Sequence, residues 1–251
     1  MSWHCKATGG YALDISDGAP CDRYPTAEGF DNMDQFYYIL KSIYHWTTQA
    51  IVGVMTCIGF ESKYNPWSWE GTIVPSTINY TTSTGNKGYG LVQWTPGSYI
   101  NQENYHKNKY IDNPYTVGKP GYAPNFSNQV GGYYDGYAQT VFLATKAWSI
   151  DGCYNKDYYE PTPTNYYSHL APEFSDYIVS TADAWELCET WVYNFERPTN
   201  PATNRSRRQA LAHELYTIYE NKPVVAPDYP PGAGFPVWLL FKFREQNFGR
   251  K

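Results

Sequence analysis

Residues 46–66 read WTTQAIVGVMTCIGFESKYNP. Either threonine of the Thr47-Thr48 pair can cap a helix, because its hydroxyl accepts hydrogen bonds from the first free backbone N–H groups. The positions that follow at helical spacing are apolar: Ile51, Val52, Met55 and Ile58. The helix is expected to end near Gly59–Ser62, since the residue before Pro66 disfavours the α conformation. The stretch therefore predicts a buried helix with Glu61 in its last turn.

The same periodicity predicts further helices. Their expected spans are residues 32–44, 129–148, 174–195 and 204–220. Within the span 174–195, Thr181 or Asp183 can cap a second helix. Residues 67–99 are rich in Thr, Ser, Gly and Asn, which favours loops with at most a small β-hairpin. Residues 101–127 are polar and are expected to be irregular.

The helices are expected to form one domain over residues 32–221. Residues 1–31 are turn-rich and have few periodic apolar positions, so we expect an extended N-terminal arm. Residues 222–234 read KPVVAPDYPPGAG, a composition typical of an extended linker. The rest of the C-terminal segment 222–251 is an apolar tail. Its apolar run is too short to span a bilayer.

The composition of the chain limits the classes of partner. Charged residues make up 17% and aromatic residues 18%, with 26 tyrosines. Such a surface suits sugars, because aromatic rings cover the apolar face of a pyranose while amides and hydroxyls bond its edge. Tyrosine acting as plain surface residue explains the composition equally well. The net charge is −5 and the longest basic run is Arg205–Arg208, so nucleic-acid binding is not expected.

The cysteines and the N-terminus exclude other classes. Five cysteines without CxxC spacing give little support for a zinc or redox site, and Cys57 is expected to be a buried thiol. The histidines show neither HxxxD nor HExxH spacing, so no metal or other cofactor is expected. The first ten residues contain no apolar run, so we expect no secretory signal.

Glu61 has the position of a proton donor. Cleavage of a glycosidic bond needs a proton on the leaving oxygen, and a carboxylic acid can supply it near neutral pH when apolar surroundings raise its pKa. Glu61 ends an apolar helix, and Trp67 and Trp69 follow it closely. A helix C-terminus also disfavours a carboxylate. The alternative is an ordinary solvated glutamate at a helix end.

A second run, GYGLVQW at residues 88–94, follows Glu61-Ser62 and Asn65-Pro66. In this order the two motifs resemble the lysozyme superfamily, and more specifically the phage tail lysozyme family. The opening GGY, the WTTQAIVGVM helix and the YNFERP motif before an arginine-bearing helix agree with this resemblance over residues 8–220. It implies a mainly α (α+β) lysozyme-like fold in which a helical lobe and a small β or loop lobe flank a cleft.

The resemblance implies roles for individual residues. Glu61 matches the catalytic acid, and residues 88–93 are expected to form one wall of the sugar cleft. The expected substrate-binding residues are Gln93, Trp94, Tyr89 and Tyr193. For Tyr193, a position in the core is the alternative.

Glu70 is the candidate for a second carboxylate of the site. Glu70 lies nine residues after Glu61, beyond a proline-containing turn, where it can activate water or balance charge on the sugar. A loop residue is the alternative for Glu70. Glu196 is expected instead to form a structural ion pair with the Arg205–Arg208 cluster.

The sequence thus predicts a phage tail enzyme that cleaves the β-1,4 bond between N-acetylmuramic acid and N-acetylglucosamine in bacterial peptidoglycan. Its expected location is the virion tail, with other tail proteins as partners and no membrane span. Hydrolysis and lytic transglycosylation both remain open. The alternative is an inactive lysozyme-like tail protein that binds cell-wall glycan or serves structurally.

Overall fold

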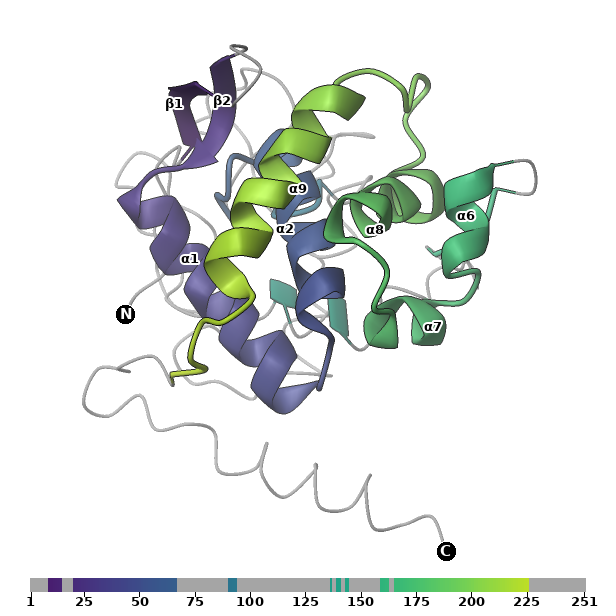
Figure 1. The fold of residues 1–251 in the computed structure, drawn as a ribbon, viewed down its shortest axis with the longest axis horizontal. Coiled ribbons are helices and arrows are strands. Elements are labelled where there is room, and N and C mark those ends of the chain that lie inside the picture. Colours follow the sequence, from purple (N-terminus) through teal and green to yellow (C-terminus); the bar gives the residue numbers. More distant parts are fainter. Residues whose placement is uncertain are drawn as a thin grey trace, which may run out of the picture.

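The computed structural model describes residues 9–14, 20–66, 90–93, 136, 139–140, 143–144, 159–162 and 165–225. Within these residues the fold is mainly α-helical, as predicted. The central helix is α2 (Thr48–Glu61), with α9 (Arg205–Tyr219) in front of it and α8 (Ala184–Trp191) beside it (Figure 1). The short helices α6 (Tyr166–Leu170) and α7 (Phe174–Val179) lie beyond α8.

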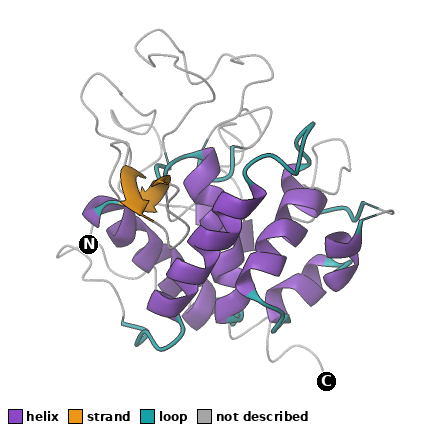
Figure 2. Cartoon of the chain, turned by 45° about the horizontal axis from the view of Figure 1, so that its top comes forward, coloured by secondary structure: helices purple, strands orange, loops and turns teal. Residues whose placement is uncertain are grey.

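Three elements complete the described fold. Helix α1 (Ala27–Tyr38) continues into a π-helical turn, η1 (Ile39–Ile43), and α8 continues in the same way into η3 (Val192–Glu196). Strands β1 (Gly9–Asp14) and β2 (Pro20–Pro25) pair antiparallel, with Asp14 opposite Pro20. Figure 2 shows this strand pair at one edge of the helices.

Helix α2 is the core of the domain. Every residue from Ala50 to Gly59 is buried. The Thr47 hydroxyl accepts a hydrogen bond from the backbone N–H of Ala50 at 3.2 Å, which confirms the predicted cap. Helix α8 packs closely on α2 at Gly53, where an added Cβ atom would lie 3.0 Å from the backbone nitrogen of Cys188 in α8. A side chain at Gly53 would therefore force the two helices apart.

Helices α2 and α8 run side by side in the same direction. At the start of α2, the Thr47 hydroxyl donates to the Ser180 carbonyl at 2.6 Å, just before α8 begins. One turn before the end of α2, the Cys57 sulfur lies 3.4 Å from that of Cys188. Both cysteines are buried free thiols, as expected for Cys57. The C-terminal ends of α2 and of the α8–η3 segment therefore lie at the same end of the domain.

The predicted helix boundaries agree well with the structure. Helix α9 matches the predicted span 204–220, and the predicted break near Thr181 separates α7 from α8. Helix α1 begins five residues before the predicted residue 32, because the Thr26 hydroxyl caps it by accepting from the Gly29 N–H at 3.2 Å. Of the predicted helix 129–148, the described residues 136, 139–140 and 143–144 are helical.

The prediction for the N-terminal segment needs correction. The expected extended arm at residues 1–31 contains the β1–β2 pair and the first turn of α1. The hairpin expected within residues 67–99 falls almost entirely outside the described residues. The division into arm, domain and tail stays a prediction. None of the helices in the described part of the chain has the length and apolar character needed to traverse a lipid bilayer.

Candidate active site

A strained turn follows Glu61. The backbone N–H and the hydroxyl of Ser62 both donate to the Ile58 carbonyl, at 2.9 and 3.2 Å, and so close the last turn of α2. Lys63 and Tyr64 then adopt left-handed conformations with φ of 52° and 64°. Each such residue costs about 1–2 kcal/mol outside glycine, so neighbouring contacts must hold the turn in place.

Tyr64 supplies those contacts. Its hydroxyl donates to the Arg23 carbonyl in β2 at 2.6 Å, and its own carbonyl accepts from the Asn32 side chain in α1 at 2.9 Å. The side chain of Tyr64 is completely buried. Strand β2 and helix α1 therefore fix the turn that orients Glu61.

Glu61 lies at the exposed end of this buried helix. Its side chain is exposed, so the prediction that apolar groups surround the carboxyl is wrong for the described part of the chain. Trp67 and Trp69 lie outside the described residues. Two guanidinium groups, those of Arg23 and Arg207, lie over the neighbouring Phe60 ring at 5.9 and 5.6 Å from its centroid.

The Gly90–Gln93 turn is the second part of the site. Gly90 has φ of 85° and Gln93 has φ of 49°. The backbone N–H and the side-chain amide of Gln93 both donate to the Gly90 carbonyl, at 3.2 and 2.9 Å. Leu91 and Val92 between them are buried, so the turn is anchored by its apolar middle.

Gln139 joins the two parts. Its side-chain oxygen accepts from the Leu91 N–H at 2.8 Å, and its side-chain nitrogen donates to the Pro66 carbonyl at 2.6 Å. The side chain of Gln139 is completely buried. An added Cβ atom on Gly90 would lie 2.6 Å from the Gln139 oxygen, so the contact also requires glycine there. One buried amide thus holds the Glu61 turn beside the Gly90–Gln93 turn.

Gln139→Leu is expected to lower the free energy of unfolding by about 2–4 kcal/mol, because the Leu91 N–H and the Pro66 carbonyl both lose a buried partner. Gln139→Glu keeps an acceptor for Leu91 but loses the donor to Pro66 and buries a carboxyl group in its place, so a loss of similar size is expected. Urea denaturation of both variants measures these losses. Wild-type stability in Gln139→Leu would contradict the joining role of this amide.

The comparison with protein families identifies the fold around these two turns. A family model described as phage tail lysozyme matches residues 31–219. The chain belongs to the phage tail lysozyme family. The match spans α1 to α9 and includes Glu61, both turns and Gln139, which confirms the resemblance drawn from the sequence motifs. Membership gives the chain a phage-associated, lysozyme-like function.

The other residues expected in the lysozyme site are only partly described. Glu70, Tyr89 and Trp94 lie outside the described residues, so their roles stay predictions. Gln93 is described, is half-buried, and belongs to the turn that Gln139 joins to the end of α2.

Tyr193 lies in η3. Its hydroxyl accepts from Arg205 at 2.7 Å, and its ring stacks on Tyr167 in α6 at a centroid distance of 6.2 Å. Its neighbour Asn194 is completely buried and donates to the Ser168 and Ala171 carbonyls, at 3.3 and 3.1 Å. Both residues thus secure α6 and its C-terminal end, while a substrate-binding role for Tyr193 stays a prediction.

The structure corrects the prediction that Glu196 forms an ion pair with the Arg205–Arg208 cluster. Glu189 takes that place, because it accepts from Arg205 at 3.0 Å and from Arg208 at 2.7 Å. The hydrogen bond of Glu196 comes instead from the indole N–H of Trp191, at 3.0 Å. Arg197 pairs with Glu160 at 2.7 Å.

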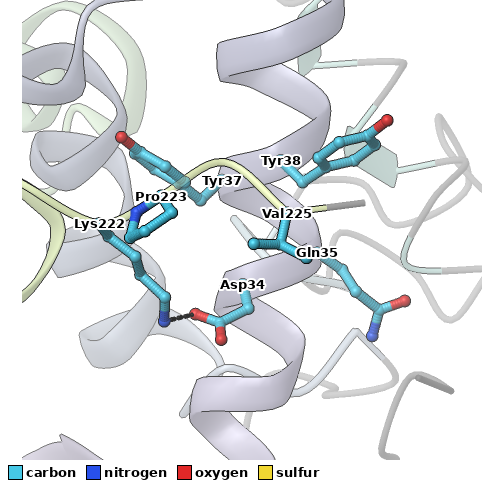
Figure 3. A pocket seen from close by; sticks show the side chains of 7 residues that line it. All are labelled: Asp34, Gln35, Tyr37, Tyr38, Lys222, Pro223 and Val225. Carbon is cyan, nitrogen blue, oxygen red and sulfur yellow. Dashed lines mark hydrogen bonds and ion pairs between the residues drawn. The ribbon is translucent and has the colours of Figure 1, made fainter. Parts of the chain in front are cut away.

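The described residues also form a small hollow far from Glu61. It has a volume of about 230 Å³ and is lined by Asp34, Gln35, Tyr37, Tyr38, Lys222, Pro223 and Val225 (Figure 3). The Asp34 carboxylate accepts hydrogen bonds from Lys222 and Tyr219 there. Tyr37 contacts Thr48 at 3.1 Å, which places the hollow beside the start of α2, at the opposite end from Glu61.

In the part of the chain that the structure describes, no three His, Cys, Asp or Glu side chains gather closely enough to hold a metal ion.

Proposed function

We propose that this chain is a tail-associated muramidase that cleaves the β-1,4 bond between N-acetylmuramic acid and N-acetylglucosamine in peptidoglycan. Glu61 is the general acid. The observation that carries the proposal is the joining of the Glu61 helix end to the Gly90–Gln93 turn by the buried amide of Gln139. Membership of the phage tail lysozyme family supports peptidoglycan as the substrate.

The geometry suits proton donation to a glycosidic oxygen. Glu61 is exposed, so a glycan chain can reach it, while the buried helix and the pinned turn keep its backbone rigid. A rigidly held acid needs little reorganisation when the leaving oxygen accepts its proton. Gly90 has no side chain, so a sugar can approach the backbone of the second turn closely.

Glu70 is a candidate for the group that activates water, and Tyr89, Gln93, Trp94 and Tyr193 are candidates for sugar binding. The enzyme acts from the phage tail, where other tail proteins are its neighbours, and opens the cell wall locally during infection.

Mass spectrometry of fragments released from purified peptidoglycan tests the proposal. A muramidase is expected to leave reducing N-acetylmuramic acid ends, whereas attack by the muramic 6-hydroxyl leaves anhydro ends. Either product supports glycosidic cleavage at the proposed bond. Binding to peptidoglycan without release of fragments would contradict the proposal and favour a glycan-binding tail protein.

A further inference from the structure

Two thiols meet at the centre of the domain. Cys57 belongs to α2 and Cys188 to α8, and the two residues are 131 positions apart in the sequence. Their sulfur atoms lie 3.4 Å apart, and the Cys57 sulfur also lies 3.6 Å from the Cys188 carbonyl oxygen. The two residues are 2% and 0% exposed, and both are free thiols. The sulfur pair is therefore a direct contact between the two central helices.

The backbones of α2 and α8 approach closely beside this pair. Gly53 lies four residues before Cys57, so the two residues share one face of α2. A Cβ atom added to Gly53 would lie 3.0 Å from the Cys188 backbone nitrogen and 3.1 Å from the Leu187 carbonyl carbon. A disulfide bridges Cα atoms that are about 4.4–6.8 Å apart. Helices packed backbone to backbone provide a separation of this order.

The two sulfur atoms are already most of the way to a bond. They have to move from 3.4 Å to a bond length of about 2.05 Å, which small changes in the two χ1 angles can achieve. A metal site is a poor alternative for the pair, because no third cysteine, histidine or carboxylate of the described residues joins it. The geometry therefore favours a bond between the two sulfurs over ligation by them.

We propose that Cys57 and Cys188 form a disulfide that joins α2 to α8 once the protein is outside the reducing cytosol of the cell that makes it. The setting rests on the proposed function, because a tail protein of a released virion is in an oxidising environment, where disulfides persist. The bond itself does not depend on glycosidase activity. Its oxidant is a small-molecule disulfide of the glutathione type.

The reaction is two successive thiol–disulfide exchanges. One cysteine, as its thiolate, attacks a sulfur atom of the small disulfide, and the other half of that molecule leaves as a thiolate and takes up a proton. The second cysteine then attacks the cysteine sulfur of the mixed disulfide, and the second small thiol leaves. The two cysteines together lose two protons and two electrons, and the small disulfide is reduced to two thiols.

Burial sets the time at which the bond can form. It raises the pKa of the Cys57 thiol, so little of the reactive thiolate is present near neutral pH. Neither sulfur is within reach of an oxidant while α2 and α8 are packed. Exchange therefore takes place when the two helices separate locally, or before they pack during folding. Oxidation is expected to be slow in the folded protein and fast during refolding.

The bond is expected to stabilise the domain. It restricts the unfolded chain by closing a loop across 131 residues, and a loop of this length gives a large entropic effect. The melting temperature of the oxidised protein is expected to be about 5–15 °C above that of the reduced protein. Cys57 lies one turn before Glu61, so the bond also secures the helix that carries the proposed acid.

A chain with only this pair of cysteines provides the test. Cys5→Ser, Cys21→Ser and Cys153→Ser together leave Cys57 and Cys188 as the sole thiols. The protein is refolded from urea in a mixture of glutathione and glutathione disulfide. Mass spectrometry after proteolysis is expected to find one peptide pair linked through residues 57 and 188. The higher melting temperature is expected to fall back when dithiothreitol is added.

Cys188→Ala in the same background is the control, and its melting temperature is expected not to respond to glutathione disulfide. The same mapping of the wild-type chain tests the bond with all five cysteines present, and so does not depend on the folding of the serine variant. Residues 57 and 188 that both stay reduced after refolding, or an oxidised form that melts no higher than the reduced form, would overturn the inference. A linked pair in a protein that releases no peptidoglycan fragments would overturn the proposed function and leave the disulfide standing.

Discussion

Glu61→Gln is expected to lower kcat/KM on purified peptidoglycan by about 10²–10⁴-fold, the usual contribution of a general acid. Glutamine has nearly the same shape as glutamic acid but cannot donate a carboxyl proton. The side chain is exposed at the end of α2, so the substitution removes no packing from the core. The melting temperature is therefore expected to stay close to that of the wild type.

Glu220→Gln is the matched control for this experiment. Glu220 is also an exposed carboxylate at the C-terminal end of a helix, α9, and it is far from both turns in sequence. Its activity is expected to equal that of the wild type. Equal rates for wild type and Glu61→Gln, measured by release of soluble fragments, would contradict the assignment of Glu61.

Glu189→Gln is expected to have the largest effect on stability, with the free energy of unfolding lowered by about 3–5 kcal/mol. Glu189 is 1% exposed and its carboxylate holds the 7%-exposed Arg208. Removing the negative charge leaves that guanidinium buried without its counter-ion. Arg208 also donates to the Thr203 and Pro201 carbonyls, at 2.7 and 2.6 Å, so the loop before α9 depends on its position.

Thermal and urea denaturation measure this effect. A loss of that size corresponds to a fall in melting temperature of about 6–20 °C for a domain of this length. Glu160→Gln breaks an exposed ion pair with Arg197 and is expected to leave the melting temperature nearly unchanged. Similar stabilities for the two variants would show that the buried pair is not what holds α8 against α9.

Local signals explain why the central helix could be predicted from the sequence. Thr47 caps α2, apolar residues follow at helical spacing, and Asn65-Pro66 prevents its continuation. All of these signals lie within about twenty residues of one another. The β1–β2 pair could not be predicted in the same way, because its register shifts on both sides of Tyr11 and breaks the two-residue alternation that identifies a strand.

The connections within the site depend on long-range contacts. Gln139 bonds Leu91 and Pro66, which are 48 and 73 residues away in the sequence. Gln139 lies within the predicted helix 129–148, but no local pattern marked it as a buried residue. Its burial and its two partners become apparent only in the folded chain.

The acidic residues near η3 illustrate the same limit. Glu196 is close to the Arg205–Arg208 cluster in sequence, which led to the predicted ion pair. Glu189 makes that pair because it lies on the side of α8 that packs against α9. Glu196, at the end of η3, accepts instead from the indole N–H of Trp191. Sequence proximity therefore could not decide which glutamate pairs with the arginines.

The general-acid role of Glu61 can be measured directly with a synthetic glycoside. The substrate is a peptidoglycan disaccharide that carries a 2,4-dinitrophenyl leaving group, which departs without needing a proton. Glu61→Gln is expected to retain most of the wild-type rate on this glycoside while losing its activity on peptidoglycan. An equal loss on both substrates, or no loss on either, would contradict proton donation by Glu61.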